Sequence, residues 1–215
     1  GAKQLVVSAG GERLVLRGDD LDDWESCCRR ARHEQGLALL QALDAKLEVE
    51  VAAGHIKLLR AEVLRDPKLL PKLLRRQDLE ALERSSGRAI FLTPEEAIAA
   101  LRAGGRRLAA LTYGWCTPGE ADCTCQYLAA VRRFLRSSLG AHVVGVFWDF
   151  GSLAQKPRTA AEDAGFGRAL QVMADVYAAA LGTMVIRHKL VPPRPASFDG
   201  AVVVQGFDSA ASAAG

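Results

Sequence analysis

The sequence predicts an α/β protein, in which a parallel sheet with flanking helices follows a β-hairpin and a helical N-terminal module. From residue 107 onward, short apolar segments alternate with amphipathic segments of helical length. That alternation is typical of parallel βαβ units with right-handed crossovers. The first 88 residues differ, because leucines recur there at helical spacing, behind two short apolar runs that flank Gly10–Gly11.

The N-terminal module is expected to cover residues 1–88. It begins as a hairpin, because Gly10–Gly11 is a dipeptide that tolerates the positive φ of a tight turn. A helix is expected over residues 19–66, weakened or split at Gly36 and Gly54, and shorter helices follow it. The apolar stripe of the long helix would consist of Leu40, Leu43, Leu47, Val51, Leu58 and Val63.

The α/β domain is expected to cover residues 89–195, and a tail to cover residues 196–215. Its first helix carries the usual N-terminal signature: Thr93 as N-cap, Pro94 in the first turn and Glu96 completing a capping box. Strands are expected at 107–115, 142–150 and 183–190, helices at 124–138 and 163–181, and a short strand-like run at 201–205.

Bulk composition narrows the class of protein. A chain with 49% hydrophobic and 25% charged residues can bury an ordinary core. A formal net charge of +3 is too weak to indicate nucleic-acid binding, and the arginine pairs are spread along the chain as solvated helix faces. No apolar run approaches the roughly 18 residues of a membrane span. We therefore expect a soluble chain that binds no nucleic acid and spans no membrane.

The cysteines indicate a reducing environment. The chain has five, an odd number, and two of them are adjacent at Cys27–Cys28, which makes a poor disulfide framework. An intracellular location is expected, either cytoplasmic or organellar after removal of a transit peptide. The sequence itself carries no secretory signal.

The candidate site lies where the predicted strands end, because ligands of open α/β sheets collect beyond the carboxyl ends of the strands. The segment GVFWDFGSLAQKPRT carries the clearest example, a strand that ends on Asp149. The alternative for Asp149 is a local role, capping a loop by accepting hydrogen bonds from nearby amides. The residues expected at this rim are Tyr113, Trp115, Cys116, Asp149, Ser152, Gln155, Lys156, Arg158 and His188.

Three cysteines offer two further alternatives. Cys116, Cys123 and Cys125 form a C-x6-C-x-C pattern, which lacks the usual C-x2-C pairs of zinc sites and would need His142 or His188 as a fourth ligand. We therefore expect free thiols and no metal. A nucleophilic Cys116 with His188 as its base is a second alternative. A bridge between Cys123 and Cys125 would be strained by their one-residue spacing.

Residues 105–190 resemble TIR-like domains, in particular the divergent TIR-like and heterokaryon-incompatibility-like proteins of fungi and microalgae. The segments that carry the resemblance are ALTYGWCTPGEAD and VFWDFGSLAQKPRTAAEDAGFGRALQVMADVYAAA. The first ends a strand in an aromatic-x-Trp segment. The second ends a strand in Asp149, followed by SL-x-Q. The matching residues of its helix are Phe166, Ala169, Leu170, Met173 and Tyr177.

The resemblance implies a TIR- or flavodoxin-like sheet and one of two functions. TIR domains act as adaptors that self-associate through the loop after the second strand, or they cleave the nicotinamide–ribose bond of NAD with a glutamate placed after the third strand. No glutamate follows Glu162 in this chain. We therefore expect an interaction or scaffold domain that self-associates or joins a larger assembly through residues 149–159, with no cofactor. The alternative is an NAD-cleaving or nucleotide-binding enzyme whose catalytic glutamate is missing from this chain or replaced.

Overall fold

The computed structural model describes residues 4–9, 12–17, 26, 34–36, 38, 41, 42, 44–117, 119–179 and 181–189. Several expectations lie outside these residues: the turn at Gly10–Gly11, the pair Cys27–Cys28, the split of the helix beyond Gly36, and the tail with its strand-like run. Within the described residues no helix is long and apolar enough to cross a membrane.

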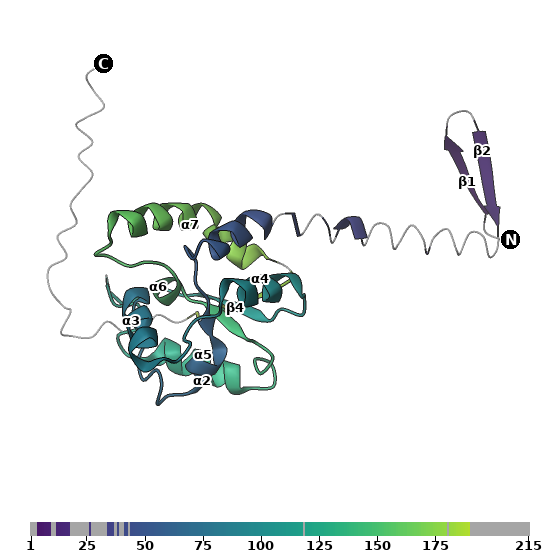
Figure 1. The fold of residues 1–215 in the computed structure, drawn as a ribbon. Coiled ribbons are helices and arrows are strands. Elements are labelled where there is room, and N and C mark those ends of the chain that lie inside the picture. Colours follow the sequence, from purple (N-terminus) through teal and green to yellow (C-terminus); the bar gives the residue numbers. More distant parts are fainter. Residues whose placement is uncertain are drawn as a thin grey trace, which may run out of the picture.

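The N-terminal hairpin is confirmed as a pair of strands. β1 (Gln4–Ala9) and β2 (Glu12–Arg17) run antiparallel, with Gln4 opposite Arg17 and Ala9 opposite Glu12 (Figure 1). The last pair in this register is Ala9 opposite Glu12, two residues that the sequence separates by Gly10–Gly11.

The α/β class is confirmed by a four-stranded sheet among the described residues, in the order β3-β5-β4-β6. β4 (Leu108–Thr112) lies parallel to both β5 (Gly145–Phe147) and β6 (Thr183–Arg187). The first of these strands is thus central, the second lies on one side of it and the third on the other. Flavodoxin-like sheets begin with the same relative order.

The sheet is mixed, whereas the sequence predicts a parallel one. β3 (Leu59–Arg60) pairs antiparallel with β5, opposite Val146 and Gly145. The expected helix over 19–66 is therefore wrong in its last part: helical residues end at Ala52, and Gly54 takes a positive φ of 73°. The chain then enters β3 and the short helix α2 (Ala61–Arg65).

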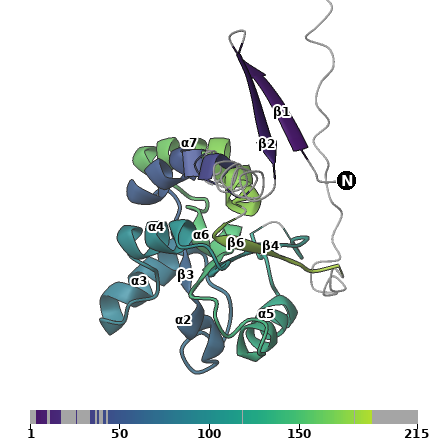
Figure 2. The same ribbon diagram turned by 90° about the vertical axis from the view of Figure 1, so that its right-hand side faces the viewer.

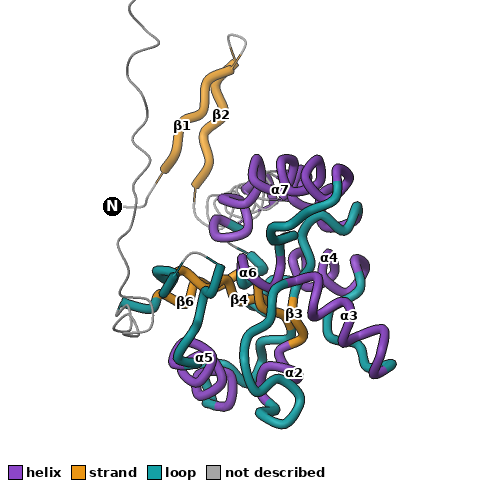
Figure 3. The backbone as a smooth tube through the Cα atoms, turned by 90° about the vertical axis from the view of Figure 1, so that its left-hand side faces the viewer, coloured by secondary structure: helices purple, strands orange, loops and turns teal. Residues whose placement is uncertain are grey.

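Helices cover both faces of the sheet (Figure 2). On one face lie α2 and α5 (Gln126–Arg136); on the other lie α4 (Pro94–Arg102) and α7 (Ala160–Ala178), as Figure 3 shows from the opposite side. The crossover connections after β4 and β5 run in opposite directions along the sheet. Because such connections are right-handed, the helices within them lie on opposite faces.

The side chains of β4 divide between two hydrophobic clusters. Ala109 and Leu111 pack with α5, whereas Leu108 and Ala110 pack with α4 and α7. Residues before position 88 contribute to the same clusters, for example Leu47 to one and Leu79 of α3 (Arg76–Ser86) to the other. The core thus draws on both sides of the domain boundary expected at residues 88–89.

Two capping boxes fix where the helices of one face begin. The predicted box of α4 is confirmed: the Thr93 hydroxyl accepts from the Glu96 amide at 3.2 Å, and the Glu96 carboxylate accepts from the Thr93 amide at 2.8 Å. α7 begins with the same arrangement at Thr159 and Glu162. The sequence shows this second T-x-x-E pattern equally clearly.

Candidate functional site

The parallel strands β4, β5 and β6 end at the same edge of the sheet, here called the carboxyl edge. Tyr113 and Trp115 follow β4, Asp149 follows β5 after one residue and begins the short helix α6 (Asp149–Ser152), and His188 follows β6. The backbone amide of His188 donates to the Thr112 carbonyl at 2.9 Å, which holds the ends of β6 and β4 together.

The Asp149 carboxylate is the polar centre of this edge. One of its oxygens accepts a hydrogen bond from the Tyr113 hydroxyl at 2.7 Å and another from the Phe150 amide at 2.7 Å. The other oxygen accepts from the indole N–H of Trp115 at 3.0 Å. Both oxygens are therefore engaged by donors of this chain, and the carboxylate anchors the segment after β4 to the end of β5.

Aromatic rings surround the anchor on the core side and the solvent side. Tyr113 packs edge-on against Tyr127 and Trp148, with ring centroids 5.0 and 5.8 Å apart. Trp115 packs edge-on against Phe150 at 5.5 Å. Trp148 and Tyr127 are fully buried, whereas Trp115 is 38% exposed. The edge thus presents a large aromatic side chain that its own contacts hold in place.

The electrostatics keep the phenols of this region protonated. Burial raises the pKa of Tyr113 far above its usual range, and the neighbouring Asp149 charge adds to the shift. Burial, followed by the same charge, raises the pKa of Tyr177 to about 12. Tyr113 therefore acts as a hydrogen-bond donor to Asp149 at any physiological pH, and it has no role as a base.

The side chains of Ser152 and Gln155 form hydrogen bonds with backbone groups instead of facing the rim. Ser152 is fully buried, and its hydroxyl accepts from the Trp148 amide at 3.0 Å. The Gln155 side chain donates to the carbonyls of Asp149 and Leu153 at 3.2 and 2.9 Å. Gln155 also exchanges two hydrogen bonds with Gln77 of α3. These contacts hold the loop after α6 against the body of the protein.

Lys156 and Arg158 are the two cations of the expected rim. Lys156 is exposed, and its carbonyl accepts from Arg75 at 3.4 Å. Arg158 donates to the Ala154 carbonyl at 2.7 Å, pairs with Asp163 at 3.1 Å, and stacks 3.4 Å above the Phe166 ring. The structure therefore brings Tyr113, Trp115 and Asp149 together, and it holds the Arg158 side chain against Asp163 and Phe166 instead.

The three described cysteines are free thiols, and the two that lie near each other are not the two that are closest in the sequence. Cys116 and Cys123 lie close enough for their thiols to interact, while Cys125 precedes α5 as its N-cap residue. Burial, followed by the neighbouring Cys116, raises the pKa of Cys123 to about 11. His188, the base considered for Cys116, packs its ring edge-on against Tyr127. Among the described residues, no group of three or more metal-ligating side chains gathers.

Three aromatic residues of the site were not predicted from the sequence. Tyr127 belongs to the apolar stripe of α5, and Trp148 and Phe150 flank Asp149 in the segment FWDF, so each reads as core. Their signal is the density of aromatic side chains around a single carboxylate. Comparisons with family models, with curated proteins and with solved structures find no match for this chain.

Proposed function

We propose that this chain is a TIR-like interaction module that self-associates through its carboxyl edge. The observation that carries the proposal is the set of three hydrogen bonds that Tyr113, Trp115 and the Phe150 amide donate to the Asp149 carboxylate. A carboxylate whose two oxygens are occupied by internal donors is suited to fixing a surface.

Trp115 supplies the surface feature that such a module needs. Exposed tryptophans that are already held in one orientation lose little conformational entropy on binding, and they dominate many protein interfaces. Trp115 meets both conditions, because Asp149 and Phe150 fix its ring while 38% of it faces solvent. The resemblance to TIR domains supports a second copy of the chain as the partner.

The test is the dependence of molar mass on protein concentration, measured by sedimentation. The parent chain is expected to self-associate, and Trp115→Ala to weaken the association constant by about thirtyfold, the effect of a central interface residue. Trp115→Phe keeps an aromatic ring and should retain most of the association. Leu139→Ala removes a side chain that is 73% exposed, outside the carboxyl edge, and serves as the matched control.

A nucleotide-binding or NAD-cleaving enzyme is the second candidate. The order β5-β4-β6 favours it, because nucleotides bind in related sheets at the point where the strand order reverses, here between the ends of β4 and β6. This candidate predicts nicotinamide release from NAD that Asp149→Asn abolishes. Release by the parent would favour the enzyme, and its absence at high protein concentration would favour the interaction module.

A further inference from the structure

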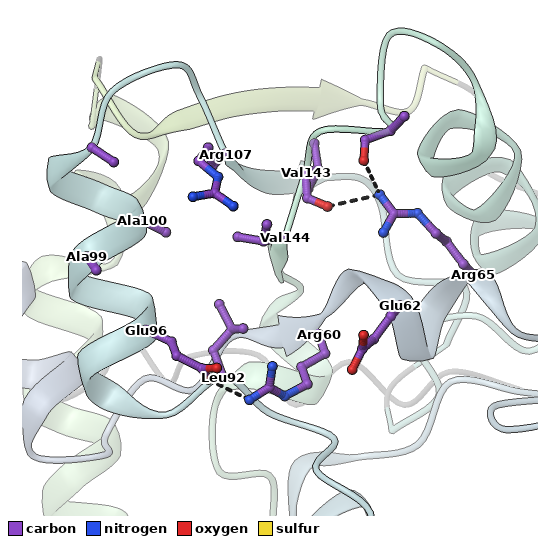
Figure 4. A pocket seen from close by; sticks show the side chains of 12 residues that line it. Arg60, Glu62, Arg65, Leu92, Glu96, Ala99, Ala100, Arg107, Val143 and Val144 are labelled. Carbon is purple, nitrogen blue, oxygen red and sulfur yellow. Dashed lines mark hydrogen bonds and ion pairs between the residues drawn. The ribbon is translucent and has the colours of Figure 1, made fainter.

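A cavity of about 490 Å³ lies at the amino-terminal edge of the sheet, opposite the carboxyl edge. Figure 4 shows α4 on one side of it and β3 with the start of α2 on another, and the residues just before β4 and β5 close it. Its volume falls within the range of small-molecule sites. No residue of the carboxyl edge lines it, so an inference from this cavity is independent of the proposed function.

Three guanidinium groups and two carboxylates line the cavity, and they are not equally engaged. Arg60 pairs with Glu96 and also donates to the Phe91 carbonyl at 2.9 Å. Arg65 is held by backbone carbonyls, among them those of Leu135 and Val143 at 3.0 and 2.9 Å. Carbonyls accept hydrogen bonds from Nε and Nη2 of Arg65 but do not neutralise its charge.

Arg107 is the guanidinium that remains available. The Arg107 backbone carbonyl accepts from the Val144 amide at 2.8 Å, but its exposed guanidinium forms no hydrogen bond or ion pair with any other described residue, and in Figure 4 this side chain projects into the space between α4 and Val144. A guanidinium presents parallel N–H donors that match a carboxylate or phosphate. Glu62, which forms no ion pair with another described residue, lies toward Arg60 in the same view, away from Arg107. An anion at Arg107 would therefore meet positive charge.

The walls next to Arg107 are small and apolar. α4 contributes Ala99 and Ala100, and Ala103 follows its last residue; their methyl groups are too short to fill the space, and Leu92 and Val144 complete the surface. Such walls favour the hydrocarbon or aromatic part of a ligand. Glu62 and Glu96 disfavour a second anionic group.

From this arrangement we propose that the cavity binds a small organic anion, with its single carboxylate or phosphate on Arg107 and its apolar body against α4 and Val144. The ligand class is thus an amphipathic monoanion. A bare inorganic anion lacks the apolar body, and a neutral analogue lacks the group that Arg107 recognises.

The experiment titrates the full chain with 2-naphthoate, followed by ligand-observed NMR and calorimetry. Binding by the parent is expected to weaken about ten- to hundredfold in Arg107→Gln, since a hydrogen-bonded charge pair is lost. Arg107→Lys should recover part of the affinity. Ala99→Phe, which fills the cavity from α4, should abolish binding. Arg133→Gln removes an equal charge from the exposed side of α5, outside the cavity, and should leave binding unchanged.

Two further probes separate the parts of the ligand. Naphthalene-2-methanol, which has the same body without the charge, and inorganic phosphate, which has no body, should each bind far more weakly than 2-naphthoate. The proposal is overturned if the parent shows no naphthoate binding at millimolar concentration, if Arg107→Gln binds as tightly as the parent, or if either probe matches naphthoate.

Discussion

Tyr113 and Asp149 lie 36 residues apart in the sequence, and the Tyr113 hydroxyl donates a 2.7 Å hydrogen bond to the Asp149 carboxylate. This contact joins the segment that follows the central strand to the segment that follows its neighbour. Trp115 makes a second bond to the same carboxylate, so its place at the surface depends on the anchor. The stability of the fold and the proposed self-association would therefore depend on the same hydrogen bonds at the carboxyl edge.

Removing the hydroxyl of Tyr113 should destabilise the fold. Tyr113→Phe keeps the ring contacts with Tyr127 and Trp148 but leaves one carboxylate oxygen with a single donor. The free energy of unfolding, from urea denaturation, should fall by about 2 kcal/mol, as for a hydrogen bond to a charged group. Tyr127→Phe is the matched control. It loses a bond to the neutral Gly114 carbonyl and should cost about 1 kcal/mol. Equal losses would contradict a special role for the Asp149 anchor.

All three tyrosines of the chain should resist ionisation while the protein is folded. Burial is the largest cause of the raised pKa of Tyr113, Tyr127 and Tyr177. Ultraviolet absorbance should show little tyrosinate in the native chain near pH 10, where unfolded tyrosines have a pKa of about 10 and are half ionised. A native tyrosine that titrates at its unperturbed pKa would contradict the described burial.

The same shifts predict how stability depends on pH. Below about pH 10 the phenols are protonated in both states, and stability is unaffected. Above that pH the unfolded chain loses protons that the native chain retains, so the free energy of unfolding should fall as the pH approaches 12, the pKa of Tyr177. Tyr177→Phe should make this fall shallower, and an unchanged slope would count against the assignment.

Gly182 should be intolerant of a methyl group. It precedes β6, and a Cβ at this position would lie 2.6 Å from the Cα and carbonyl oxygen of Leu101 in α4. Both are backbone atoms, so Gly182→Ala must push α4 and β6 apart and should lower the melting temperature, at a cost of about 1–3 kcal/mol. Gly167→Ala is the control. Gly167 lies in α7 with open space around it, and alanine there should stabilise by about 0.5–1 kcal/mol. Similar changes in stability for Gly182→Ala and Gly167→Ala would contradict the close packing of Gly182 against α4.

Oxidation should join Cys116 to Cys123. The two thiols lie close enough to interact, so the oxidant diamide, which takes up two electrons and two protons, should leave an intramolecular disulfide between them, detectable by peptide mass. The reaction should accelerate with rising pH, because the pKa of Cys123 is raised to about 11 and the thiolate is the nucleophile. Cys123→Ser should prevent the bridge and Cys125→Ser should not. A bridge between Cys123 and Cys125 would be the contrary result.

The alternation of strands and helices after residue 107 was predictable because each element is long enough to show its own periodicity. The approximate ends of β4, β5 and β6 could therefore be predicted, and so could the proximity of Tyr113, Trp115 and Asp149. β3 was not predictable. It has two residues, too few to show strand alternation, and Leu58 and Leu59 continue the leucine spacing of the preceding helix.

The orientation of the loop after Asp149 was also beyond the sequence. Polar residues there suggest a rim, but the sequence does not reveal that α6 turns the chain back, so that Ser152 is buried against the Trp148 amide. Nor does the sequence reveal that the Arg158 guanidinium stacks on the ring of Phe166, eight residues later. The cavity beside Arg107 depends in the same way on how α4 packs, which no local pattern encodes.

Amide hydrogen exchange at low and high protein concentration tests the self-association surface most directly. If the carboxyl edge is that surface, exchange should slow at residues 113–116 and 149–156 as the concentration rises, and Trp115→Ala should remove the effect. Exchange at 139–144, on the opposite edge, should not change. Protection at 139–144 alone, or no change with concentration at either edge, would contradict the account.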